Sequence, residues 1–120
     1  MHTAANIVVG IVGLIHVYIV VLEMFLWEKP IGLRTFHITE DFASATREMA
    51  ANQGLYNAFL AAGLFWSLHT GDIHVQRFFL GCVLVAGVYG ALTVHAKTLM
   101  VQAVPAGVGL VLLGLMPSYY

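Results

Sequence analysis

Residues 4–27 read AANIVVGIVGLIHVYIVVLEMFLW and decide the fold class. This run is mostly apolar, and its acidic or basic side chains are those of His16 and Glu23. A helix needs roughly 20 apolar residues to cross the hydrocarbon core of a bilayer. The run is therefore long enough to span. Glu23 follows His16 after two helical turns, so the two side chains lie on nearly the same face. An ionisable side chain at that depth is a functional-site hypothesis by default.

The composition indicates the same class. The chain of 120 residues is 60% hydrophobic and 9% charged, and its mean hydropathy is +0.87. A soluble domain of this size could not bury so much apolar surface. Its formal net charge is -1 and it has no basic run, so nucleic acid is not an expected partner. The expected partner is the lipid bilayer.

The charged residues divide the chain into four apolar stretches within one domain covering residues 1–120. The expected spans are residues 4–27, 50–68, 78–94 and 98–116, with a charged connection over residues 28–49. Pro30 and Gly32 fit a helix that stops just after Trp27. Thr39 can cap a second helix that begins near Glu40 and runs to Leu68. The sequence thus predicts an all-α, integral membrane four-helix bundle.

The positions of the cationic residues predict the orientation. Lys29, Arg34, Arg47 and Lys97 fall in the first and third connections, whereas the termini and the second connection hold only Arg77. By the positive-inside rule, both termini are predicted on the non-cytoplasmic side.

Glycine and alanine are spread through the last three spans, where small side chains allow helices to approach closely. They fit a compact bundle of one chain, and a homo-oligomer stays open.

Four polar side chains open the second span. Gln53 and Asn57 are four residues apart, and so are Asn52 and Tyr56, which places them on adjacent stripes of one helix. Because the first two spans are antiparallel, these groups enter the membrane at about the depth of Glu23. We expect them to form a cluster with Glu23, since unpaired polar groups in hydrocarbon are costly.

His16 lies about 10 Å deeper than Glu23, at 1.5 Å per residue. At that depth the polar groups on the third and fourth spans are Tyr89, Thr93 and Gln102. Pro105 is expected to bend the fourth span or to leave a backbone carbonyl free to bond a neighbour. A kink beside Gln102 would widen a cavity there.

Two interpretations of the polar cluster stay open. In one, Glu23 and the amides form a satisfied hydrogen-bond network that fixes the packing of two helices. In the other, Glu23 and His16 are acid/base catalytic groups in a ligand cavity, and Asn52, Gln53, Tyr56, Asn57, Tyr89 and Gln102 bind the ligand. No metal site is predicted, because the spans have no Glu-x-x-His or His-x-x-x-His pair. The residues indicate no particular cofactor.

Three strings resemble the signature of a known family: HVYIVVLEMFLW at residues 16–27, AANQGLYNAFLAAGL at residues 50–64 and VQAVPA at residues 101–106. They are similar to those of the membrane proteins grouped as domain-of-unknown-function family 1304. The resemblance covers nearly the whole chain. It implies a small multi-span bacterial membrane protein, and with it the inner (plasma) membrane, without implying an activity.

Three functions follow as hypotheses. The first is a site that binds a small lipophilic molecule and acts on it by acid/base chemistry, such as isomerisation, epoxide formation or opening, or hydration. The second is a proton-coupled transporter, because small multidrug transporters are also four-span chains with a glutamate in the first span. Their short loops differ from the long connection over residues 28–49. The third is a structural or accessory membrane protein.

Overall fold

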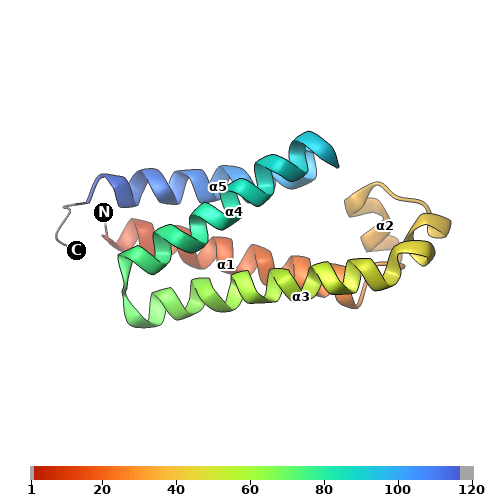
Figure 1. The fold of residues 1–120 in the computed structure, drawn as a ribbon, viewed down its shortest axis with the longest axis horizontal. Helices are drawn as coiled ribbons and strands as arrows, with labels where there is room; N and C mark the ends of the chain where they lie inside the picture. The colour runs from red at the N-terminus through yellow and green to blue at the C-terminus, as the bar shows by residue number, and fades with distance from the viewer. Residues whose placement is uncertain (1, 117–120) are drawn as a thin grey trace.

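The computed structural model describes residues 2–116, apart from the side chains of Lys97 and Thr98, and this part of the chain is all helical. The helices are α1 (His2–Met24), α2 (Pro30–Phe36), α3 (Glu40–Thr70), α4 (Ile73–Thr93) and α5 (Ala96–Gly114). Four long helices lie side by side in alternating directions along a body of 52 × 25 × 17 Å (Figure 1). The α3–α4 turn and the start of α1 lie at one end. The α4–α5 turn and α2 lie toward the other.

Local sequence explains where α3 begins and ends. Thr39 Oγ1 accepts a hydrogen bond from the backbone N–H of Phe42 at 3.2 Å, and Glu40 and Asp41 occupy the first turn, where the helix dipole favours acids. The helix ends at Gly71, whose φ of 70° suits glycine. The predicted start near Glu40 is confirmed, and the helix runs two residues beyond the predicted end at Leu68.

The short helix α2 was not predicted, and α1 ends at Met24 rather than at Trp27. Pro30 and Gly32 were interpreted as helix breakers. Pro30 instead occupies the first position of α2, where its fixed φ favours a helix and its missing N–H costs nothing. The helix ends at His37, which adopts the left-handed conformation with φ 57°.

The second connection is shorter than predicted. Asp72 Oδ1 accepts hydrogen bonds from the backbone N–H groups of His74 at 2.9 Å and Val75 at 3.4 Å. This cap starts α4 at Ile73, whereas the predicted span starts at residue 78. The expected spans 78–94 and 98–116 leave a short connection, and the structure has a short turn between Thr93 and Ala96.

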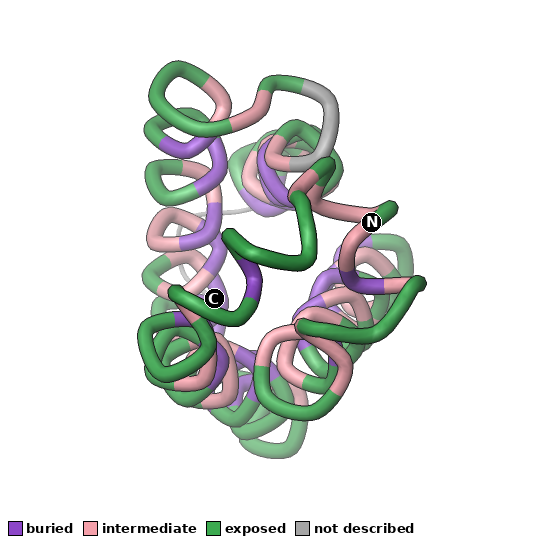
Figure 2. Tube along the Cα trace, turned by 90° about the vertical axis from the view of Figure 1, so that its right-hand side faces the viewer, coloured by how far each residue is buried: buried purple, intermediate pink, exposed green. Residues whose placement is uncertain are grey.

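The four long helices close a ring in which α1 packs on α3 and α5, and α4 packs on α5 and α3. Figure 2 shows the buried residues on the inner sides of the helices and the exposed ones outside. The core consists of aliphatic side chains, chiefly Val9, Val12, Leu64, Leu80 and Leu113.

The outer surface is also apolar. Large hydrophobic side chains are exposed on all four long helices, among them Leu14, Phe59, Leu92 and Val111. Within the described residues, α1 and α4 are long and apolar enough to cross a membrane by length and composition. The apolar part of α5, Leu99–Gly114, is shorter. The structure therefore has four long helices, as many as the expected spans. Two of them, α1 and α4, are long and apolar enough to cross a membrane.

Gly87 and Gly81 on α4 provide a test of close helix packing. A Cβ at Gly87 would lie 2.8 Å from the backbone nitrogen of Ala103 on α5, whereas a Cβ at Gly81 meets nothing within 4 Å. We expect Gly87→Ala to lower the free energy of unfolding by about 1–2 kcal/mol, because backbone cannot rotate away from the clash. Gly81→Ala should be neutral or stabilising, since alanine favours helices. Equal effects in reversible unfolding in mixed micelles would contradict this packing.

Candidate functional site

A cavity of about 860 Å³ lies toward the end of the bundle that holds α2 and the α4–α5 turn. One stripe of α1 forms its floor, with residues at helical spacing: Ile15, Tyr18, Ile19, Leu22 and Glu23. Residues of α4 at the same spacing, from Ala86 to Thr93, form the opposite wall. Cavities of 300 to 1,000 Å³ or so commonly hold small molecules.

Glu23 lines this cavity beside α3. Its Oε1 accepts a hydrogen bond from Asn57 Nδ2 at 2.5 Å, and the same amide nitrogen donates to the backbone carbonyl of Gln53 at 3.2 Å. Gln53 and Asn57 both line the cavity. The predicted contact between Glu23 and the amides of the second span is thus present for Asn57, whereas Gln53 joins the network only through its backbone carbonyl.

His16 is fully buried and does not line the cavity. Its Nδ1 lies 2.8 Å from the carbonyl oxygen of Val12, and its Nε2 lies 3.1 Å from Gln102 Nε2. A carbonyl only accepts, so Nδ1 carries the proton and Nε2 accepts from the Gln102 amide. Both ring nitrogens are engaged. Gln102 does line the cavity, so the His16 ring contacts a residue of the cavity wall.

The other predicted binding residues separate into two groups. Tyr89 lines the cavity on α4, although its side chain is 69% exposed. Asn52 and Tyr56 are exposed and lie outside the cavity wall. The physical reason is the 100° rotation per helical residue: the stripe that carries Gln53 and Asn57 faces the cavity, so the adjacent stripe turns away from it. Thr93, predicted near His16, lines the cavity without bonding the ring, and its hydroxyl donates to the backbone carbonyl of Tyr89.

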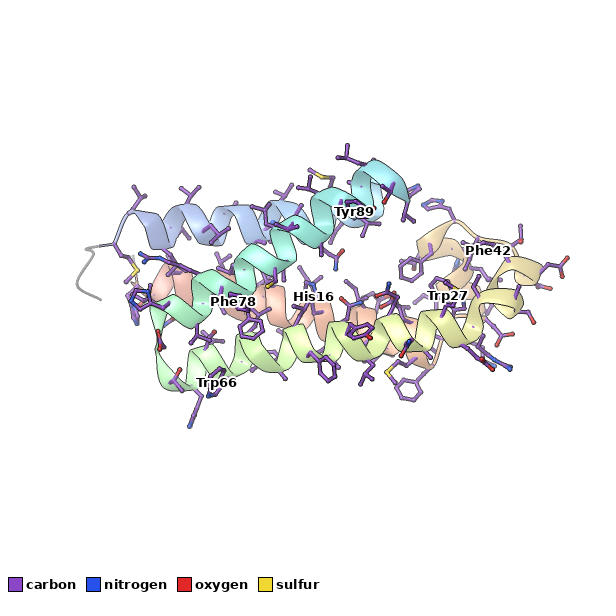
Figure 3. The ribbon with its side chains drawn as sticks, viewed as in Figure 1. His16, Trp27, Phe42, Trp66, Phe78 and Tyr89 are labelled. Carbon is purple, nitrogen blue, oxygen red and sulfur yellow. The ribbon has the colours of Figure 1, made fainter. Side chains whose placement is uncertain are left out.

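Sequence reasoning missed the aromatic wall that α2 completes. Trp27 and Phe36 line the cavity, with ring centroids 4.9 Å apart, and the Trp27 indole N–H donates to Thr46 Oγ1 at 3.1 Å. Figure 3 shows Tyr89 on α4 above His16, and Trp27 beyond His16 toward α2. Pro30 at a helix start was the available signal, since it places the residues after it on a helix rather than in an open loop.

A stacked histidine pair joins α2 to the α4–α5 turn. The rings of His37 and His95 have centroids 4.3 Å apart and are nearly parallel at 19°. His37 ends α2 and His95 lies in the turn, so this contact links two segments that both border the cavity.

A second buried amide was also missed. Gln76 on α4 is fully buried, and its Nε2 donates to Asn6 Oδ1 on α1 at 3.1 Å. The sequence placed it in a polar connection, because Asp72 was not recognised as a helix cap. Gln76 lies toward the opposite end of α1 from Glu23, so it contributes to packing rather than to the cavity.

No three His, Cys, Asp or Glu side chains come together in a way that could hold a metal ion among residues 2–116 with described side chains. The described side chains that line the cavity include the carboxyl group of Glu23 and the amides of Gln53, Asn57 and Gln102.

Comparisons with known proteins give the chain its family. No solved structure matches it. It is 26% identical over 114 residues to the uncharacterized protein YpaA of Lactococcus lactis subsp. lactis (strain IL1403), and the match covers 92% of each chain. The family described as "Protein of unknown function (DUF1304)" matches residues 10–114, from α1 to the end of α5. This range includes every residue of the Glu23 and His16 clusters, and the chain belongs to the DUF1304 family.

Proposed function

We propose that this chain is an integral membrane protein that binds a small lipophilic molecule in its cavity, with Glu23 as the proton-exchanging group. One observation carries the proposal: a carboxyl group in the wall of a cavity that is otherwise mostly apolar. A carboxyl group that only stabilised helix packing would be expected to be enclosed by neighbouring atoms, because protein interiors leave few voids larger than a water molecule.

The surface supports the membrane part of the proposal. Exposed apolar side chains cover the four long helices, while most acidic and basic residues lie toward the ends, in the α1–α3 link, in the first turns of α3 and around Asp72 and Arg77. A bilayer core of about 30 Å matches α4, whose 21 residues rise about 31 Å. We propose that all four long helices span, with α3 projecting beyond the core.

The arrangement of connections supports the proposed orientation. The α1–α3 link and the α4–α5 turn lie toward one end of the body; Lys29 and Arg34 lie in the link, Arg47 in the first turns of α3 and Lys97 in the first turn of α5. We propose that this end faces the cytoplasm and that the termini face away from it, in a bacterial plasma membrane.

The geometry supports different roles for the two predicted catalytic groups. Glu23 borders the cavity and can exchange a proton with a ligand directly, which is what acid/base catalysis or proton coupling requires. His16 is a positioning residue in this proposal, because it accepts the hydrogen bond that orients Gln102. Isomerisation and hydration stay hypotheses about the reaction.

Filling the cavity tests the proposal. Thr93 lines the cavity, and its neighbour Leu92 is 81% exposed and lies outside the wall. We expect Thr93→Phe to abolish saturable binding of a neutral solvatochromic dye in lipid nanodiscs, because the ring occupies the ligand volume. Leu92→Phe, the matched control, should bind the dye as the parent protein does.

Copurifying lipophiles, measured by mass spectrometry after organic extraction, provide an independent readout of the same pair. Dye binding and lipophile content that are the same in Thr93→Phe, Leu92→Phe and the parent protein would refute the proposal.

A further inference from the structure

The charge of the cavity wall restricts the kind of ligand. Among the described side chains that line it, Glu23 carries the one carboxyl group, and the others are apolar, aromatic, hydroxyl or amide groups. The cations of the neighbouring connection lie elsewhere: Lys29 and Arg34 are exposed, and Arg47 Nη1 lies 3.7 Å from Glu28 Oε1. Among these described groups, Glu23 has no cationic partner.

The hydrogen bond from Asn57 engages one carboxyl oxygen of Glu23. An amide stabilises a carboxylate but does not neutralise its charge, and an uncompensated charge in a largely apolar cavity is costly. A ligand with a positive charge would supply the compensation, whereas an anionic ligand would add repulsion.

The aromatic side chains around the cavity favour the same sign of charge. Tyr18, Trp27, Phe36 and Tyr89 line it, from α1, the connecting segment, α2 and α4. The face of an aromatic ring carries negative electrostatic potential and attracts cations, quaternary ammonium groups in particular. The same rings provide contact area for an apolar ligand body.

We infer that the ligand of this cavity is a lipophilic cation, an amine or quaternary ammonium compound whose charged head pairs with Glu23 while its apolar body lies along Ile15, Ile19 and Leu22. This inference rests on the proposed function. It adds the charge and the chemical class of the ligand.

A charge-matched series of probes tests it. The series consists of octyltrimethylammonium, its neutral isostere in which carbon replaces the nitrogen atom, and octyl sulfonate. Trp66 is exposed and does not line the cavity, so Trp66→Phe leaves Trp27 as the reporter beside the ligand. Trp27 emission in nanodiscs is then titrated with each probe, and Glu23→Gln is compared with Glu48→Gln, which changes an exposed carboxylate.

The expected result is that the cation binds about tenfold or more tightly than its neutral isostere, while octyl sulfonate binds weakest. Glu23→Gln should remove this preference, so that the cation and its neutral isostere bind equally, because glutamine keeps an oxygen for Asn57 but carries no charge. Glu48→Gln should change neither. Equal binding of cation and neutral isostere, unaffected by Glu23→Gln, would overturn the cationic ligand and leave the lipophile site standing. Failure of every probe to displace the neutral dye, together with unchanged dye binding in Thr93→Phe, would overturn the site itself.

Discussion

Leucine in place of His16 is expected to lower the free energy of unfolding by about 1–3 kcal/mol. His16 is fully buried and connects α1 to α5 through Gln102. Leucine fills a comparable volume, so the loss comes mainly from the Gln102 amide, which would lose its acceptor at a site with 6% exposure. In the proposed membrane setting the unfolded helices find other polar partners, which moves the effect toward the lower end of this range.

A double-mutant cycle separates the hydrogen bond from packing. Gln102→Leu alone should also destabilise, because the His16 Nε2 acceptor would lose its donor. The double variant, with leucine at both positions, should be more stable than the two single effects predict, since replacing both partners by apolar groups can be nearly neutral. Reversible unfolding in mixed micelles measures all four proteins. Strictly additive losses would show that the two side chains do not interact in the folded protein.

The same cycle tests the positioning role of His16. If His16 orients Gln102 at the cavity wall, His16→Leu should weaken dye binding even in samples that are fully folded. A purely structural His16 would change stability and leave the affinity unaltered.

The sequence was sufficient for the long helices and for part of the site. Apolar runs and the Thr39 cap placed α3 within two residues, because both signals are local. The contact between Glu23 and Asn57 could be predicted from their positions along the two helices. Antiparallel neighbouring helices bring the end of one apolar segment beside the start of the next. These inferences needed no knowledge of how the helices rotate about their axes.

The sequence could not supply the rotation of each helix about its axis or the contacts between residues far apart in the chain. Asn52 and Gln53 are adjacent in sequence, and only the rotation of α3 determines that Gln53 lines the cavity and Asn52 does not. Gln76 and Asn6 are 70 residues apart, and nothing local marks them as partners. The cavity depends on α2, whose position follows from a close contact at Gly32 that no periodic pattern encodes.

Alanine in place of Gly32 is expected to displace α2 and open the cavity. Gly32 is buried, and a Cβ there would collide with the backbone carbonyl oxygen of Leu26 and lie 2.7 Å from that of Trp27. Carbonyl oxygens cannot rotate away as a side chain can, so α2 must move. We expect a loss of about 1–3 kcal/mol in the free energy of unfolding, in spite of the higher helix propensity of alanine.

Displacement of α2 would also remove Thr35 and Phe36 from the cavity wall and separate Phe36 from Trp27. Trp27 emission in the Trp66→Phe background should therefore shift to the red, and the affinity for the neutral dye should fall. Gly10→Ala is the matched control, because a Cβ at Gly10 meets only Leu68 Cδ1, at an ordinary 3.8 Å. It should leave both readouts unchanged. If Gly32→Ala loses stability but binds the dye as the parent protein does, α2 stabilises the fold without forming part of the ligand site, and the site is completed by the four long helices alone.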